Sequence, residues 1–349
     1  MTVYLDNAAT TKIDPKVWKY MQECSQYYGN PSCNHTLGKK ALDIVENAKE
    51  IIARKINAEP CEIIFMSGGT EANNLAITQA NGHIITTAIE HVSVLAACGR
   101  NTTFLPVDSK GYIDLDKLQS EIRKGAELVS AGWINNEIGT IQDIAAIAEI
   151  CNRYGVLLHT DAVAALGHVE TDVQKICIGM MSLSAHKIYA PKGVGALYVN
   201  KRLDVEPLII GGRQEFSIRG GTENILGIAG FGKAVEILDH NQQIYTLVNT
   251  LREGIQRAFD NVRINTPEIE THVLSVEFEG IDGGWLMQML SARGIYVSQG
   301  SCGNPGHSHV IEAIGGNARQ VIRFSFGKFN TMQDVDIILQ ALIEIVSNV

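Results

Sequence analysis

Apolar segments alternate with amphipathic helical patterns from residue 40 to about residue 200. Apolar side chains three or four positions apart predict helices at 41–56, 70–80 and 143–155. Short apolar runs predict strands at 62–67, 83–89, 127–134, 156–162 and 193–199. Alternation of strands and helices is typical of a largely parallel α/β sheet with helices on both faces.

The pattern changes in the last third of the chain. Two long helical patterns at about 224–239 and 241–260 are followed by shorter strand-like and helix-like segments up to an amphipathic helix at 334–346. This mixture predicts a small α+β domain. We therefore expect a large α/β domain at 15–245, with 1–14 and 246–349 forming the small domain.

Composition excludes several classes of protein. The 349 residues carry 29 basic and 38 acidic side chains, a net charge of −9, and no basic run, so binding to nucleic acid is not expected. No uncharged apolar stretch is long enough to span a membrane. The seven cysteines are scattered without a C-x-x-C pair, and "MTVYLDNAATT" does not resemble a secretion signal, which favours a reduced, cytoplasmic protein.

Polar clusters follow the predicted strands. In open α/β sheets ligands bind beyond the carboxyl ends of the strands. Four such clusters are "SGGTEANN", "EHVSV", "NNEIG" and "HTDAVAA", and Lys187 follows a fifth apolar segment, "GMMSLSA". We expect these clusters to meet at one edge of the sheet and to form the ligand site.

Two charged residues lie in segments that look destined for the interior. Asp161 ends an apolar strand and Lys187 lies between two apolar segments, so each needs a partner of opposite charge or a covalent one. The glycines of "SGGTEAN" precede a helix that Thr70 is expected to cap, and a helix N-terminus binds phosphate. A glycine turn and a helix cap are the plain alternatives. Pyridoxal phosphate offers a partner to each group: its aldehyde to the Lys187 amine, its ring nitrogen to the Asp161 carboxylate and its phosphate to the helix N-terminus.

Long ordered motifs run nearly from end to end of the chain: "YLDNAATT", "YGNPSCNH", "FMSGGTEANNLAI", "HIITTAIEHVSVL", "INNEIGTIQDI", "LLHTDAVAALG", "SLSAHKIYAPKGVGALYV", "GGRQE", "RGGTEN" and "IRFSFGKF". Together they resemble the pyridoxal-phosphate-dependent cysteine desulfurases of the class V aminotransferase group, which have fold type I. The resemblance implies a mostly parallel seven-stranded sheet flanked by helices, plus a small α+β domain.

The resemblance also implies how the cofactor is held. Lys187 would bond its aldehyde, Asp161 would pair with the ring nitrogen, and His91 would stack on the ring and move protons. The phosphate would be held by Gly69, Thr70, Ser184, His186 and, from a second subunit, Thr222. This last contact implies a homodimer with shared active sites.

For the substrate, L-cysteine, the resemblance implies three further roles. Asn136 would lie near the phenolic oxygen of the cofactor and the substrate carboxylate, which Arg323 would clamp with its two-pronged guanidinium. The Cys302 thiolate would attack the substrate sulfur, leaving alanine and a persulfide. A sulfur acceptor or scaffold protein would then receive the sulfur, for iron–sulfur cluster assembly or thiolation.

The sequence departs from the family pattern at three places. The interval from Cys302 to Ser308 is about three residues shorter than in longer-loop relatives, and the alanine before the cysteine is missing. Ala164 stands where a glutamine is common, and Arg213 where some relatives have histidine. These departures leave a second interpretation open: a related lyase or aminotransferase, such as a lyase releasing sulfide, that does not use Cys302.

Two other interpretations are disfavoured. A non-enzymatic docking scaffold would not need Lys187, Asp161, His91 and Arg323 together. A metal site at Cys302, His307 and His309 has a spacing that fits no common zinc motif, so no metal is expected.

Overall fold

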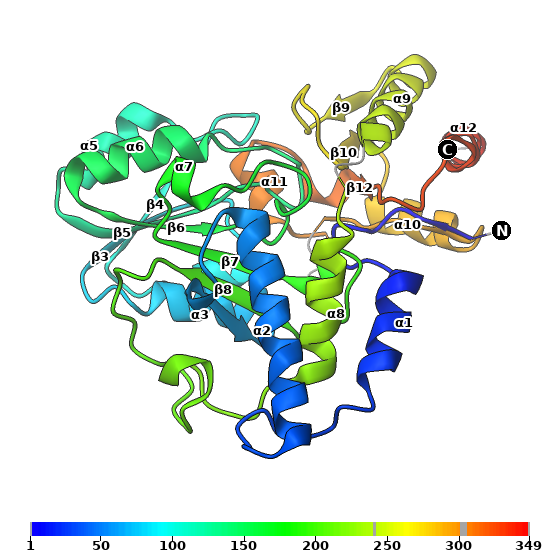
Figure 1. The fold of residues 1–349 in the computed structure, drawn as a ribbon. Helices are drawn as coiled ribbons and strands as arrows, with labels where there is room; N and C mark the ends of the chain where they lie inside the picture. The colour runs from blue at the N-terminus through cyan, green and yellow to red at the C-terminus, as the bar shows by residue number, and fades with distance from the viewer. Residues whose placement is uncertain (1, 240–241, 301–305, 348–349) are drawn as a thin grey trace.

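The computed structural model describes residues 2–239, 242–300 and 306–347, and its centre is a seven-stranded sheet with helices on both faces (Figure 1). The sheet order is β2-β8-β7-β6-β5-β3-β4. Its strands are β2 (Ile63–Met66), β3 (His83–Thr87), β4 (Thr102–Leu105), β5 (Ala126–Gly132), β6 (Leu157–Asp161), β7 (Met180–Ser184) and β8 (Gly195–Val199). All run parallel except β8, which is antiparallel to both neighbours, so the predicted fold class is confirmed.

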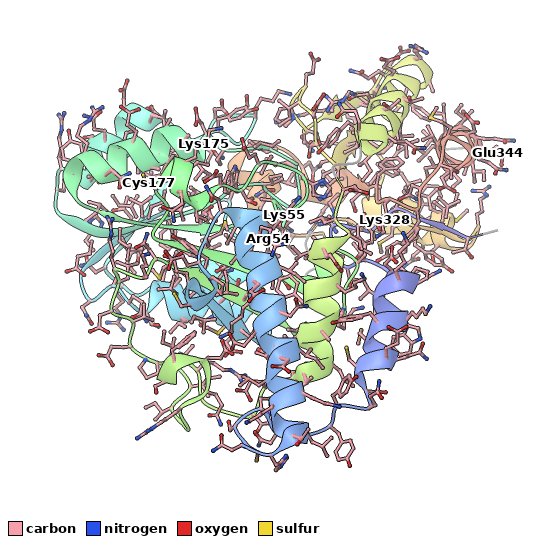
Figure 2. All side chains as sticks on the ribbon, viewed as in Figure 1. Arg54, Lys55, Lys175, Cys177, Lys328 and Glu344 are labelled. Carbon is pink, nitrogen blue, oxygen red and sulfur yellow. The ribbon has the colours of Figure 1, made fainter. Side chains whose placement is uncertain are left out.

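Different helices cover the two faces of this sheet. One face packs against α2 (Thr36–Ile56), α5 (Leu115–Ile122), α6 (Ile144–Tyr154), α7 (Val173–Ile176) and α8 (Ile225–Glu236). The other face packs against α3 (Gly69–Ile77) and α4 (Val92–Leu95). Arg54 and Lys55 lie in the last turn of α2 (Figure 2), where the helix dipole favours positive charge.

A second, smaller core lies beside the sheet. Its helices are α9 (Gln242–Ala258), α10 (Gly283–Ser291) and α12 (Met332–Val346), and its antiparallel strands are β9 (Val262–Ile264), β10 (Val273–Phe278) and β12 (Val321–Ser325). The N-terminal strand β1 (Val3–Tyr4) pairs with β11 (Ile295–Tyr296), and Val3 and Leu5 are buried in this core. The separate cores support a domain boundary near residue 245, which stays a prediction.

Some elements could not be predicted from the apolar pattern. They include α1 (Pro15–Cys24), β4, α4, α5 and α7, each with one or two buried side chains only. The remaining elements are α11 (His309–Ala313) and the 3₁₀ turns η1 (Pro60–Glu62), η2 (Ala185–Lys187), η3 (Gln214–Ser217) and η4 (Ala318–Gln320). Within the described ranges, no helix combines the length and apolar character needed to cross a bilayer.

The connection from β8 to α8 has an unusual backbone. Glu215, Phe216 and Ser217 all have positive φ angles, of 44°, 58° and 69°, which non-glycine residues rarely adopt. The buried Glu215 carboxylate lies 3.0 Å from Lys49 Nζ in α2 and accepts the Phe65 N–H at 2.8 Å. Burial raises the pKa of Glu215, and Lys49 opposes this shift. The buried ion pair therefore fixes the loop that leads to Thr222.

Candidate active site

A cavity of about 270 Å³ opens at the carboxyl ends of β3, β5, β6 and β7 and at the start of α3. Nine of the sequence-predicted residues line it: Gly69, Thr70, His91, Asn136, Asp161, Ser184, His186, Lys187 and Arg323. Thr222 is exposed on the loop before α8 and does not line this cavity. Cys302 lies outside the described residues. The polar clusters after the strands thus meet at one edge of the sheet, as expected.

Lys187 ends the short turn η2 immediately after β7. Its amine donates to the backbone carbonyls of Ala8 and Ala9, at 3.0 Å for Ala9. Thr11 holds the same turn from the N-terminal segment, because its hydroxyl donates to the His186 carbonyl at 2.8 Å and accepts the Tyr189 N–H at 2.7 Å. The N-terminal segment therefore positions an amine at the cavity wall.

Asp161 is the last residue of β6 and is only 9% exposed. Its Oδ1 accepts the Val163 N–H at 2.9 Å and its Oδ2 accepts Asn73 Nδ2 at 2.7 Å. Among the described residues no cation forms an ion pair with this carboxylate. A buried carboxylate oriented by neutral donors, with lone pairs facing a cavity, suits a protonated ring nitrogen.

The N-terminus of α3 differs from the expectation in one respect. The helix begins at Gly69 with Gly68 as its N-cap, so Thr70 lies inside the first turn and is not the cap. A β-carbon on Gly69 would lie 2.6 Å from Val163 Cγ2, which explains the glycine. Because no side chain caps α3, its first N–H groups are available to a phosphate.

Two more predicted phosphate ligands, Ser184 and His186, line the same cavity. His186 Nδ1 lies 3.1 Å from Thr10 Oγ1. Burial, with help from the charges of Lys187 and Lys192, lowers the pKa of His186 to about 4, so its imidazole is uncharged at neutral pH. A neutral imidazole and a hydroxyl can both donate a hydrogen bond to a phosphate oxygen.

His91 is the N-cap of α4 and presents its ring to the cavity. Its Nδ1 accepts the Ser93 N–H at 3.1 Å and lies 2.7 Å from Ser93 Oγ. Desolvation lowers the pKa of His91, although the charge of Asp161 opposes the shift. A neutral imidazole with an occupied Nδ1 has its Nε2 available for proton transfer.

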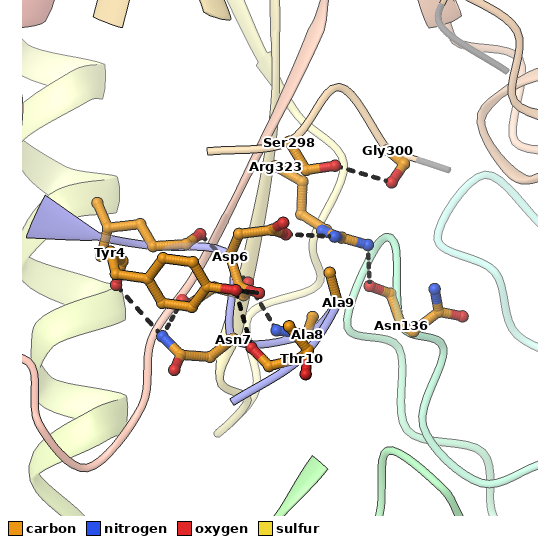
Figure 3. A network of polar contacts seen from close by, with 12 residues as sticks. Tyr4, Asp6, Asn7, Ala8, Ala9, Thr10, Asn136, Ser298, Gly300 and Arg323 are labelled. Carbon is orange, nitrogen blue, oxygen red and sulfur yellow. Dashed lines mark hydrogen bonds and ion pairs between the residues drawn. The ribbon is translucent and has the colours of Figure 1, made fainter. Parts of the chain in front are cut away.

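Arg323 is buried in β12, and the N-terminal segment supplies its partner (Figure 3). One Nη donates to Asp6 Oδ1 at 2.7 Å, and the other donates to the Asn136 carbonyl at 3.0 Å. These contacts hold a planar guanidinium at the cavity wall, where it can bind a carboxylate. Asp6 was missed by the sequence reasoning, although it lies in the quoted motif "YLDNAATT".

Glu90 was also missed, and it lines the cavity beside His91. The side chain is buried, and its Oε1 accepts the Thr87 hydroxyl at 2.6 Å. Burial raises the pKa of Glu90 to about 7. Its backbone carbonyl accepts a hydrogen bond from His309 Nε2 at 2.9 Å. Glu90 and His91 therefore supply one protonatable group inside the cavity wall and one at its surface.

These contacts fit pyridoxal phosphate. An amine, a buried carboxylate with no ion-pair partner in the described part of the chain, and an uncapped helix N-terminus share one cavity, and each matches one functional group of the cofactor. Ala164 lines the cavity with a methyl group, so it offers no hydrogen bond there. Within the described ranges no three histidine, cysteine, aspartate or glutamate side chains gather in a way that could hold a metal ion.

Several known proteins are similar to this chain over nearly its whole length. The family model described as aminotransferase class-V matches residues 3–338. A cysteine desulfurase IscS of Methanosarcina thermophila is 40% identical over 99% of this chain and 92% of its own length. The corresponding protein of Dictyoglomus turgidum is 38% identical over 99% and 94%. A solved structure described as a NifS-like protein is 35% identical, with a TM-score of 0.94 and full coverage of both chains.

Proposed function

From the premise that the chain belongs to the class V aminotransferase family and is a pyridoxal-phosphate-dependent cysteine desulfurase, we propose how its own residues convert L-cysteine into L-alanine and transfer the sulfur. The observation that carries the proposal is that the Lys187 amine and the Asp161 carboxylate line one cavity.

The cofactor supplies an aldehyde that bonds amines and a ring that accepts electron density from the substrate. The Ala8 and Ala9 carbonyls orient the Lys187 amine, which would bond that aldehyde and, when free, would accept the Cα proton of the substrate. The negative charge of Asp161 would keep the ring nitrogen protonated. The uncapped start of α3, together with Ser184 and His186, would hold the phosphate.

Arg323 and Asn136 bind the substrate carboxylate, and His91 exchanges protons through Nε2. The Cys302 thiolate attacks the substrate sulfur, so a sulfur–sulfur bond forms while the carbon–sulfur bond breaks. The products are a Cys302 persulfide and, after protonation of the carbon, alanine. An acceptor or scaffold protein then takes the sulfur, for iron–sulfur cluster assembly or thiolation.

We propose that the enzyme is a homodimer in which Thr222 of the partner subunit completes the phosphate site. The exposure of Thr222 on a loop fixed by the Lys49–Glu215 pair supports this. The apolar side chain of Ile210, 87% exposed near the same loop, also favours a contact with a second subunit. Free thiols such as Cys24 fit a reducing compartment, and we place the enzyme in the cytoplasm.

Mass spectrometry of the protein after brief treatment with L-cysteine tests the role of Cys302. We expect one added sulfur on the peptide that contains Cys302, and no such addition in Cys302→Ala. Cys177→Ala is the matched control, because Cys177 is an exposed free thiol on the end of α7 (Figure 2) and should not matter. Unchanged alanine formation in Cys302→Ala, with sulfide released, would contradict the persulfide step and support a sulfide-releasing lyase.

Lys187→Ala tests the cofactor bond. The visible absorption band of the bound cofactor should disappear, and alanine formation should fall by about 10³-fold or more, because the amine serves both as the covalent anchor and as the base. A variant that keeps the band and its activity would contradict the assignment.

A further inference from the structure

Asn73 lies in α3 with only 1% of its surface exposed, and its amide connects two site residues. Its Nδ2 donates to Asp161 Oδ2 at 2.7 Å and to Ser93 Oγ at 2.9 Å. A carboxylate can only accept hydrogen bonds, so the orientation of the amide is fixed with nitrogen toward Asp161. Both hydrogens of the amide are therefore committed, one to each partner.

The Ser93 hydroxyl continues this chain of hydrogen bonds. Its oxygen accepts from Asn73 and lies 2.7 Å from His91 Nδ1. The Ser93 backbone N–H, which can only donate, reaches the same nitrogen at 3.1 Å, so Nδ1 is an acceptor and the hydroxyl hydrogen points to it. His91 Nδ1 thus accepts two hydrogen bonds and cannot carry a proton in this arrangement. The hydrogen of the neutral ring must be on Nε2.

We propose that Asn73 and Ser93 are positioning residues that link Asp161 to His91, orienting the carboxylate and fixing His91 in the tautomer protonated at Nε2. The catalytic use of this link rests on the function proposed above for Asp161 and His91. The hydrogen-bonded chain itself does not depend on that function. It makes Nε2 the single nitrogen through which His91 gives or takes a proton.

The amide oxygen of Asn73 distinguishes a positioning role from simple packing. Asn73 Oδ1 is buried and has no hydrogen-bond partner in the described part of the chain. Leaving a buried carbonyl oxygen without a donor is unfavourable, and a leucine of similar size would avoid the loss. The amide is therefore explained by its two donated hydrogen bonds and not by its volume.

Other charges around His91 act on the protonation of its imidazole. Asp161 and Glu137 favour the imidazolium, whereas Lys187 and His309 oppose it. Desolvation is the largest influence and lowers the pKa of His91. The two hydrogen bonds accepted by Nδ1 also lower the pKa of His91, because a proton on Nδ1 would face the hydrogens of the Ser93 hydroxyl and of the Ser93 backbone N–H.

Nitrogen NMR of the cofactor-loaded protein, with labelled histidine, tests the link directly. We expect wild-type His91, assigned by comparison with His91→Gln, to carry its proton on Nε2 at neutral pH. In Ser93→Ala the backbone N–H alone still donates to Nδ1, so a detectable share of rings should carry the proton on Nδ1 and the pKa of His91 should rise. Ser93→Thr keeps the hydroxyl and should restore the wild-type spectrum. A wild-type ring protonated on Nδ1, or a Ser93→Ala spectrum identical to wild type, would overturn the proposal.

Kinetics separate a positioning role from a structural one. Ser93→Ala should lower kcat about five- to tenfold, as expected for one hydrogen bond, with little change in KM for cysteine. Asn73→Leu should in addition release the cofactor about tenfold more readily, because Asp161 loses a donor. Thr78→Ala is the matched control, since the Thr78 hydroxyl, at the other end of α3, donates to the Leu75 carbonyl of the same helix at 3.0 Å.

The two proposals can fail separately. If the protein does not turn over cysteine but His91 shows the expected tautomer and the expected response to Ser93→Ala, the proposed function is wrong and the link stands. If turnover is normal in both Asn73→Leu and Ser93→Ala, the link has no catalytic use.

Discussion

Glu90 and His91 are adjacent in the sequence, and burial acts on their charges in opposite directions. It raises the pKa of Glu90 to about 7 and lowers that of His91. In both cases the desolvated environment disfavours the charged form. The wall of the cavity therefore holds an acid close to its titration point beside a neutral imidazole, next to the cofactor site.

The raised pKa of Glu90 predicts a pH dependence of stability. The unfolded carboxyl titrates at 4.5 and the folded one at about 7, so the folded protein binds more protons between these values. The free energy of unfolding should fall as the pH rises through this range, by up to about 3 kcal/mol from this group. In Glu90→Gln this decline should be smaller. Urea unfolding of both proteins at about pH 5, 6, 7 and 8 measures this decline. If the free energy of unfolding falls equally with pH in the two proteins, the assignment is contradicted.

At the scale of single residues, the sequence motifs predicted which residues take part in the chemistry but not which side chains hold them in place. Lys187 and Asp161 could be predicted because their residue types are unusual after apolar strands, whereas His91 was assigned only through the family resemblance. Asn73 lay in a quoted motif but was missed, because a sequence does not show which side chains of a helix turn face a neighbouring strand. Asp6 was missed for a related reason, since its partner Arg323 is more than three hundred residues away in the chain.

At the scale of elements, the start of α3 depends on a close approach between two segments. Gly69 packs against Val163, which follows β6, and leaves no room for a β-carbon. The contact holds the first turn of α3 beside Asp161, so phosphate site and ring site keep a fixed separation. The same contact explains why position 69 requires glycine, whereas a β-carbon added to Gly68 would meet no atom within 4 Å.

Substitutions at this contact give a second prediction. Gly69→Ala should lower the free energy of unfolding by about 1–3 kcal/mol through overpacking, and Gly69→Ala with Val163→Ala should recover most of the loss. Gly68→Ala is the control, because its φ of 164° is extended and no atom lies within 4 Å of the place that a β-carbon would occupy there. Chemical denaturation measures all three variants. An equal loss in Gly68→Ala would show that packing on Val163 is not the cause.

The β8–α8 connection gives a third prediction. Lys49→Met leaves the buried Glu215 carboxylate without its cation and should cost about 3 kcal/mol of stability. Lys49→Met combined with Glu215→Gln should be more stable than Lys49→Met alone, because no buried charge remains unpaired. Thermal and urea unfolding of the single and double variants checks the order. A double variant as unstable as the sum of both singles would contradict the coupling.

Among the elements, those with many buried side chains could be predicted and those with few could not. α2 and α6 show a clear apolar stripe, whereas α1 buries only Val17 and Cys24. The edge strand β4 buries Leu105 alone, so its alternation is weak. The direction of β8 could not be predicted either, because an apolar run has the same appearance in a parallel and an antiparallel strand.

At the scale of the whole molecule, the phosphate site that we propose to be shared between two subunits predicts complementation between them. Thr222→Ala and Lys187→Ala proteins are each expected to be impaired on their own. In a mixed dimer, the site that combines Lys187 of one subunit with Thr222 of the other is intact. Mixing after mild dissociation should therefore restore alanine formation above the sum of the separate proteins. No recovery, with exchange of subunits verified by mass spectrometry, would show that Thr222 does not act across the dimer.

The path of the N-terminal segment has a consequence for how the enzyme is made. Val3 and Leu5 are buried among side chains of residues 244–345, and Ala8 and Ala9 then hold the Lys187 amine. In the folded protein the side chains that bury Val3 and Leu5 come from segments more than two hundred residues further along the chain. The Ala8 and Ala9 carbonyls reach their final places only when that small core has closed, so capture of the vitamin-derived cofactor by Lys187 is coupled to the folding of both cores and not of the large sheet alone.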